Sequence, residues 1–250
     1  MKKDVIAGLG EIGYPIFTLI NQAYPAAGYD KNEKIIPKSD DKITNLPVRF
    51  LHICIPYNEK FSKNVEELII KFNPEGVVIH STISPKTTYH LQEKNQIPII
   101  YSATRGVHKR MLDDLKKYMK FFAIENNAPR KEFAIDEFSA LMKKCGVKPK
   151  QVSSPITLEL SKIICDTSYY GWLINYAQIS KMISDRYDVD YDEMWTFADE
   201  IHENLGNRPK MFPGFIGGHC VIPNLELINE KSLFEINEIN EIFKKFLDSA

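Results

Sequence analysis

Residues 8–13 read GLGEIG, directly after the short apolar run Val5–Ala7. A helical pattern follows from Tyr14 to about Ala23, and a second apolar segment ends at Gly28-Tyr29-Asp30. The order is therefore strand, GxGxxG turn, helix, strand and acidic residue. This order is typical of a dinucleotide-binding βαβ unit, although a purely structural glycine turn is an alternative.

Each glycine of the turn has its own expected role. The first makes the tight turn, the second lets backbone approach a pyrophosphate, and the third lets the helix pack closely on the strand. The N–H groups that begin the helix then attract phosphate. A carboxylate at Asp30 would bind ribose hydroxyls and repel a 2′-phosphate, so the pattern favours NAD over NADP. Lys31 and Lys34 weaken that preference.

Strand and helix patterns alternate through the first 150 residues. Strands are predicted at 49–55, 76–79, 97–101 and 119–124, and helices at 61–72, 85–94 and 131–144. Such alternation predicts an α/β fold, with a Rossmann-type doubly wound parallel sheet and helices on both faces.

Ligands of such sheets bind where the parallel strands end. That rule places the glycine turn, Asp30, Pro56 and Ser81-Thr82 along one edge. The residues expected to contact the dinucleotide are Gly8, Gly10, Glu11, Ile12, Gly13, Asp30, Pro56 and Thr82. His52 and His80 belong to or follow strands, and we expect them to be core residues.

The pattern changes after Gln151. Ser153-Ser154-Pro155 is a helix-start signal, and the next glycine or proline before about Tyr187 is Gly171. At 1.5 Å per residue, about 33 residues would form a helix about 50 Å long. Its apolar positions are too numerous for one stripe, so we expect it to pack on its own domain and on a second copy, as a homodimer. Further helices are predicted at 191–204 and 233–247.

Three charged residues on the long helix, Glu159, Lys162 and Asp166, have the spacing i, i+3, i+7 and are expected to share one face. One interpretation is a solvated ladder of ion pairs that contributes a few tenths of a kcal/mol. The other is a catalytic face, and the next segment favours it.

Residues 211–224 read MFPGFIGGHCVIPN, with three glycines and two prolines around Cys220. We call residues 211–220 the cysteine loop. A glycine-rich loop exposes backbone N–H groups, which can lower the pKa of a thiol and bind an oxyanion. His219, adjacent to the cysteine, could also favour the thiolate.

These motifs, together with Pro85-Lys86-Thr87-Thr88 and Glu159…Lys162, come in an order that resembles the UDP-glucose/GDP-mannose (nucleotide-sugar) 6-dehydrogenase family. The resemblance covers roughly residues 4–228. The Gly-Gly-His-Cys form of the loop looks most like the N-acetyl-mannosaminuronate branch. The resemblance implies oxidation of a sugar primary alcohol to a carboxylate in two NAD-dependent hydride transfers.

The resemblance also implies roles for particular residues. Cys220 would hold the aldehyde as a thiohemiacetal and then as a thioester, which water cleaves. Lys162 would stabilise the developing oxyanion, and Thr82 would help to place the attacking water. Gly217 and Gly218 would contact the substrate.

The sequence departs from the family at several points. Family members carry a further α/β domain that binds the nucleotide of the substrate, so this chain is expected to be a shortened member without it. Arg105 stands near the position of a family glutamate, and with His108 it could clamp a small anion. Asp166 replaces an asparagine four residues after the helix lysine, and Asn224 replaces an aspartate four residues after the cysteine. We expect Asp166 and Asn224 to be compensating neighbours.

Composition excludes several classes of protein. The 250 residues carry 32 Lys and Arg against 33 Asp and Glu, and this balance argues against nucleic-acid binding by charge. No apolar run approaches the ~20 residues of a membrane span. Four scattered cysteines neither form a zinc motif nor a disulfide framework, so we expect no metal and a reducing, cytoplasmic location.

The sequence thus predicts a Rossmann domain at 1–150 and a helical dimerisation and cysteine-loop domain at 151–250. The expected function is NAD-dependent oxidation of a sugar-like or anionic small molecule. Two alternatives stay open. One is an NAD-binding sensor or partner subunit without dehydrogenase activity, and the other is a two-electron hydroxy-acid dehydrogenase that uses Lys162 as acid and base.

Overall fold

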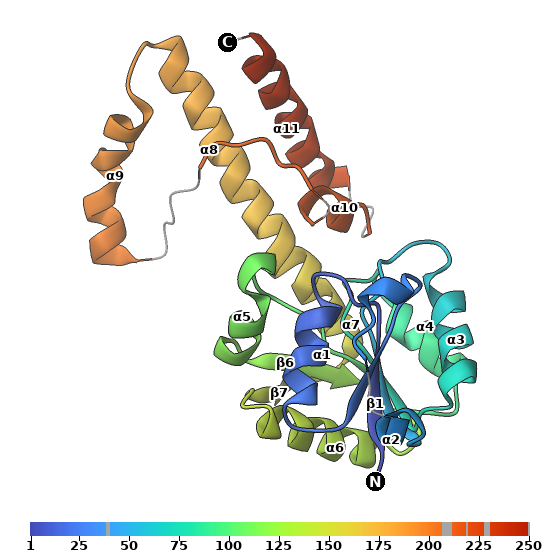
Figure 1. The fold of residues 1–250 in the computed structure, drawn as a ribbon. Helices are drawn as coiled ribbons and strands as arrows, with labels where there is room; N and C mark the ends of the chain where they lie inside the picture. The colour runs from blue at the N-terminus through green and yellow to red at the C-terminus, as the bar shows by residue number, and fades with distance from the viewer. Residues whose placement is uncertain (39–40, 207–211, 219, 228–230, 250) are drawn as a thin grey trace. The chain divides into compact units, whose positions relative to one another are not determined.

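The computed structural model describes residues 1–38, 41–206, 212–218, 220–227 and 231–249 (Figure 1). The chain divides into two compact units, Met1–Leu160 and Ser161–Ala250. The division falls after Leu160, whereas the sequence placed it after residue 150. The difference arises because β7 (Pro149–Gln151) pairs with the sheet, and α7 (Pro155–Leu160) packs on β5 and β6.

The first unit contains a seven-stranded sheet in the order β2-β1-β3-β4-β5-β6-β7. The other strands are β1 (Lys3–Ala7), β2 (Ala26–Tyr29), β3 (Val48–Ile53), β4 (Gly76–Ile79), β5 (Ile99–Tyr101) and β6 (Lys120–Ile124). All neighbouring pairs are parallel except β5 and β6. The predicted doubly wound parallel sheet is therefore confirmed, with one antiparallel pair that the sequence did not predict. The connection 102–119 starts and ends at one edge of the sheet, where Lys120 Nζ donates to the Ser102 carbonyl at 2.8 Å.

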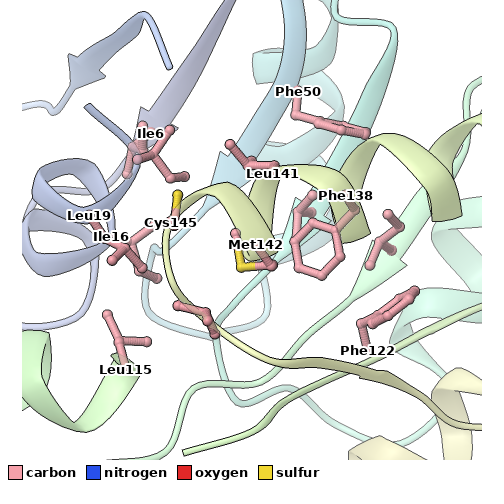
Figure 2. Close-up of a cluster of buried hydrophobic side chains, with 14 of the residues drawn as sticks. Ile6, Ile16, Leu19, Phe50, Leu115, Phe122, Phe138, Leu141, Met142 and Cys145 are labelled. Carbon is pink, nitrogen blue, oxygen red and sulfur yellow. The ribbon is translucent and has the colours of Figure 1, made fainter. Parts of the chain in front are cut away.

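Helices cover both faces of the sheet, as predicted. Their bounds are α1 (Gly13–Asn21), α2 (Asp41–Thr44), α3 (Phe61–Phe72), α4 (Thr87–Lys94), α5 (Met111–Lys117) and α6 (Lys131–Lys144), with 3-10 turns at Glu33–Ile35 and His108–Arg110. Alternate residues of the strands point to opposite faces. Ile6 joins an apolar cluster with α1, α5 and α6, shown in Figure 2, whereas Val5 and Ala7 join a cluster with α3, α4 and α7.

The predicted long helix is present but is not a uniform α-helix. A π-helical segment, Ser161–Ser168, follows α7 and leads into α8 (Tyr169–Arg186). Within it, the Thr167 hydroxyl donates to the Lys162 carbonyl at 3.2 Å, and the Ser168 hydroxyl donates to the Ile164 carbonyl at 2.8 Å. Hydroxyls that bond to the preceding turn in this way often bend helices, and π segments are frequent at functional sites.

The second unit is helical. Besides α8 it contains α9 (Tyr191–Leu205), α10 (Val221–Glu226) and α11 (Lys231–Ser249), and α11 packs along α8 (Figure 1). Helix α9 begins after Asp190, whose side chain accepts the Glu193 N–H at 2.7 Å, and it ends at Leu205, one residue beyond the predicted end. Among the described residues, no helix is both long and apolar enough for a bilayer.

Candidate cofactor and catalytic sites

The glycine turn has three sterically distinct positions. Gly8 has φ +90°, and a Cβ there would lie 2.7 Å from the Cys54 carbonyl oxygen. A Cβ on Gly13 would lie 1.7 Å from the Gly8 carbonyl oxygen, whereas a Cβ on Gly10 would meet nothing within 4 Å. The first and third glycines therefore satisfy turn and packing constraints, as predicted. The second borders open space of the kind that a bound pyrophosphate needs.

Asp30 is fixed above this turn at the carboxyl end of β2. One carboxylate oxygen accepts the Leu9 N–H at 2.7 Å, and the other accepts the Asn32 N–H at 2.8 Å. The side chain thus ties β2 to the glycine turn. Each carboxylate oxygen has more than one acceptor position, so the group keeps capacity for ribose hydroxyls.

The ends of the next two strands complete this edge. Gly8, Cys54 and His80 each donate a backbone N–H across to the neighbouring strand, at 2.8 Å in every case. The Ser81 hydroxyl bonds to the Ile55 carbonyl at 2.6 Å, which joins the segments that carry Pro56 and Thr82. We call Gly8–Gly13, Asp30, Pro56 and Thr82 the cofactor edge. The predicted alignment of these segments along one edge follows from the observed strand order.

Two predicted ligand residues contact each other. His108 Nδ1 lies 2.8 Å from a Glu11 carboxylate oxygen, which joins the connection after β5 to the glycine turn. Arg105 points elsewhere: its Nη2 donates to the Met119 carbonyl at 2.9 Å, and its guanidinium lies 4.9 Å from the centre of the Phe121 ring. These contacts give Arg105 a structural role, and the anion clamp of Arg105 and His108 stays a prediction.

A buried polar chain lies behind the cofactor edge. His52 and His80 stack with ring centres 5.2 Å apart and share a 2.9 Å nitrogen–nitrogen contact, and His80 also contacts the Ser102 carbonyl at 3.1 Å. Asp4 accepts two bonds from Arg49 at 3.0 and 2.7 Å. Burial lowers the pKa of His80 well below its ordinary value. The core role expected for both histidines is confirmed.

Sequence reasoning missed the charged members of this chain, Asp4, Arg49 and Lys120. Lys120 is 6% exposed, and its ammonium group is satisfied by Ser102, Ala103 and Thr104. The available signal was the presence of charged residues within runs that otherwise read as buried strands, because buried charges are nearly always paired.

Glu159 is not part of an ion-pair ladder. Its fully buried carboxylate accepts the Lys86 N–H at 2.6 Å, and the Thr88 N–H and hydroxyl at 3.0 and 2.6 Å. It therefore caps the start of α4, and burial raises its pKa. Glu159 thus bonds to the start of α4, whereas Lys162 and Asp166 pair with each other. The common face of the three residues stays a prediction.

Lys162 and Asp166 form an ion pair in the π segment of the second unit. Helix α10 packs against this segment. Cys220 is the residue before α10, and the Asn224 N–H donates to the Cys220 carbonyl at 3.2 Å. The structure thus brings the elements that carry Lys162, Asp166, Cys220 and Asn224 together within one unit. We call these four residues the cysteine site.

The cysteine loop combines a buried root with exposed glycines. Ile216 is 6% exposed and packs with Val221, Leu225 and Ile236, while Gly217 and Gly218 are exposed. Gly218 has φ +76°, which favours glycine. His219 lies outside the described residues. All four cysteines lie in the described part of the chain and are thiols, and no group of three possible metal-ligating side chains occurs there.

No protein-family model and no curated protein sequence matches the chain. Solved structures do. UDP-D-ManNAc dehydrogenase from Pyrococcus horikoshii has a TM-score of 0.79 at 15% identity, over 99% of this chain and 70% of that one. UDP-N-acetyl-mannosamine dehydrogenase from Staphylococcus aureus has a TM-score of 0.73 at 16% identity, over 98% and 69%.

A third similar structure is 3-hydroxyisobutyrate dehydrogenase from Mycobacterium tuberculosis. Its TM-score is 0.66 at 13% identity, over 98% of this chain and 94% of that one. The nucleotide-sugar dehydrogenases were the family that the motifs resembled. The chain has the fold of these enzymes, and it shares that fold with a hydroxy-acid dehydrogenase.

Proposed function

We propose that the protein is an NAD-dependent oxidoreductase that converts the primary alcohol of a sugar-like substrate to a carboxylate. The carrying observation is the pairing of two features in one dehydrogenase fold. The first is a glycine turn with Asp30 bonded to Leu9 above it. The second is Cys220 at the start of a helix that packs on the segment of Lys162 and Asp166.

The cofactor edge fits NAD. The open space at Gly10 leaves room for the pyrophosphate, and α1, which begins at Gly13, presents the positive end of its helix dipole beside the glycine turn. Asp30 would accept the ribose hydroxyls and disfavour a 2′-phosphate. When bound, NAD accepts a hydride from the substrate carbon in each of two oxidations.

Cys220 carries the substrate between the two oxidations. Its sulfur adds to the aldehyde carbon, and the aldehyde oxygen takes a proton, which gives a thiohemiacetal. Loss of a hydride from that carbon and a proton from its hydroxyl gives a thioester. Water then adds to the carbonyl, the C–S bond breaks, and the thiol re-forms. In total, one alcohol, one water and two NAD⁺ give one carboxylate, two NADH and three protons.

Lys162 stabilises the negative oxygen in these steps. Lys162 pairs with Asp166 in the π segment, and a cation held near the reacting carbon stabilises an oxyanion. Thr82 would position the attacking water. Gly217 and Gly218 offer exposed backbone to the substrate.

The functional unit is a homodimer formed through residues 155–187. Helix α8 packs on α11, yet Tyr169, Tyr170 and Tyr176 stay 53%, 50% and 63% exposed. Aromatic side chains exposed in this way are typical of protein–protein interfaces. Light scattering should give about 58 kDa, twice the 28.8 kDa of one chain; a 29 kDa species at micromolar concentration would contradict the dimer.

A hydroxy-acid dehydrogenase is the second candidate, because the chain spans 94% of the hydroxyisobutyrate dehydrogenase structure. In that function Lys162 would act as acid and base, and Cys220 would have no chemical role. A two-electron oxidation releases one NADH per substrate. The number of NADH per product therefore separates the two candidates, and an NAD-binding sensor would give none.

Cofactor binding is tested by a thermal melt with NAD. A ligand that binds only the folded state raises its stability, so millimolar NAD should raise the Tm of the wild type. Gly10→Val should remove that shift because its side chain fills the space for the pyrophosphate. An unchanged wild-type Tm would contradict the proposal.

A further inference from the structure

Three amide side chains are buried together in the second unit. Asn175 and Gln178 belong to α8 and Asn240 to α11, and their exposed fractions are 0%, 0% and 1%. Asn175 Nδ2 donates to Gln178 Oε1 at 2.8 Å, and Gln178 Nε2 donates to Asn240 Oδ1 at 3.1 Å. We call these three residues the amide clamp.

The amide clamp ends on the backbone of the cysteine loop. Asn240 Oδ1 accepts the Ile216 N–H at 2.7 Å, and Asn240 Nδ2 donates to the Ile216 carbonyl at 3.2 Å. Gln178 Nε2 donates to the Gly214 carbonyl at 2.8 Å. Asn240 thus pairs with both backbone groups of Ile216, as a neighbouring strand would, and Gln178 fixes the loop two residues earlier.

The cysteine loop is also held by the side chain of Ile216. Ile216 packs in an apolar cluster with Val221 and Ile236, and Val221 is the first residue of α10. Cys220 therefore lies between two anchored residues, Ile216 and Val221, with the exposed glycines on its N-terminal side. Ile216 is four residues before Cys220 in the sequence, so the place where its backbone is held limits where Cys220 can lie.

Burying the amide clamp between α8 and α11 costs free energy. Buried amides lose their bonds to water, and Asn175 Oδ1 has no hydrogen-bond partner among the described residues. Apolar residues of similar size would pack the two helices without that cost. Unlike apolar contacts, hydrogen bonds are directional, so the amides hold the loop backbone at one position.

We propose that Asn175, Gln178 and Asn240 are positioning residues that hold the cysteine loop so that the Cys220 thiol is reactive. Asn240 acts directly on the loop, Gln178 acts on both the loop and Asn240, and Asn175 orients Gln178. This inference rests on the proposed function, which makes Cys220 the nucleophile.

The test measures iodoacetamide alkylation of Cys220 against pH in the full-length chain, by mass spectrometry of the peptide. Exposed Cys165, in the π segment, is the internal reference. The test variants are Asn240→Leu and, if that chain does not fold, Gln178→Met. The matched control is Gln92→Met, because Gln92 is a buried amide of the first unit that bonds to the backbone of residues 95, 97 and 99.

We expect wild-type Cys220 to be alkylated with a midpoint at least one pH unit below that of Cys165. In Asn240→Leu the midpoint should rise toward the pH 8.5 of an ordinary thiol, and alkylation at pH 7 should slow at least fivefold. Gln92→Met should lower the Tm and leave the Cys220 midpoint unchanged.

Two results would overturn the inference in distinguishable ways. If the wild-type midpoint is low and Asn240→Leu behaves like Gln92→Met, the amide clamp does not position the thiol, and the proposed function stands. If wild-type Cys220 is no more reactive than Cys165, Cys220 is not the nucleophile, and the inference fails together with that part of the proposed function.

Discussion

The cofactor edge and the cysteine site are built by different means. The cofactor edge is formed mainly by backbone groups. Its strand ends are joined by backbone hydrogen bonds of 2.8 Å, and its glycines leave space that side chains would fill. The cysteine site is held mainly by side-chain contacts, namely the Lys162–Asp166 ion pair and the bonds of the amide clamp to the cysteine loop. A site made by backbone tolerates few substitutions but leaves a clear motif. A site made by side chains can exchange its residues, which is the prediction for Asp166 and Asn224.

The largest effect is expected where backbone packing is tightest. Gly13→Ala places a Cβ 1.7 Å from the Gly8 carbonyl oxygen, so the strand and α1 must separate. We expect the free energy of unfolding to fall by about 3 kcal/mol or more. Gly10→Ala is the control, because its Cβ enters open space and should change stability by less than about 1 kcal/mol. Equal losses in urea unfolding would contradict the assigned roles.

Lowering the pH should lower the stability of the first unit, because His80 is buried in its neutral form. Burial holds the pKa of His80 far below its value in the unfolded chain. Below about pH 6.5 the unfolded state therefore binds a proton that the folded state does not, and stability falls with pH. The expected loss is about 1 kcal/mol between pH 7.5 and 5.5.

The acid effect can be assigned with two variants. In His80→Gln the loss between pH 7.5 and 5.5 should largely disappear, while in His90→Gln, which changes an exposed histidine of α4, it should persist. Hydrogen exchange of peptides from β4 restricts the measurement to the first unit. A wild-type protection that does not change over this pH range would contradict the prediction.

At the cysteine site, Asp166 and Asn224 should be energetically coupled. They belong to elements that pack together, and the resembled family has the amide and the carboxylate in exchanged positions. A double-mutant cycle of Asp166→Asn and Asn224→Asp should give a coupling energy of about 0.5 kcal/mol or more, measured by unfolding. Additive effects would show that the two replacements are independent.

The smallest effect concerns Glu11. Its carboxylate pairs with His108 beside the expected pyrophosphate position, where a negative charge opposes an anionic ligand. Glu11→Gln should tighten NAD binding about two- to fivefold, the range of an exposed charge near a helix start. Glu33→Gln, which changes an exposed acid outside the glycine turn, should leave affinity unchanged. Weaker NAD binding to Glu11→Gln, by calorimetry, would contradict this account.

The sequence predicted the backbone-built part of the molecule well. Glycine spacing and apolar periodicity are local signals, so α3, β4 and α6 have the predicted bounds, and the strand ends that form the cofactor edge were identified. The antiparallel direction of β6 was missed because it depends on the edge of the sheet at which the connection 102–119 ends, and the strand's own sequence does not show this. Lys120, which anchors that return, gives no local signal beyond a charge within a strand.

The side-chain-built part was predicted only in outline. Cys220 and Lys162 stand out through the glycine loop and through the resemblance. The π segment was missed because a change from i+4 to i+5 backbone bonding has no marker in the apolar spacing; the hydroxyls of Thr167 and Ser168 bond to carbonyls within it. The amide clamp was missed because Asn175 and Asn240 are far apart in sequence and meet only through tertiary packing.

In the proposed function, Cys220 carries a substrate through two NAD-dependent oxidations. The direct measurement is the ratio of NADH formed to carboxylate formed, with NAD and a panel of nucleotide sugars, free sugars and hydroxy acids. We expect two NADH per carboxylate with a sugar-like alcohol, and we expect the Cys220→Ser protein not to release the acid. One NADH per product with a hydroxy acid, undiminished by Cys220→Ser, would contradict it.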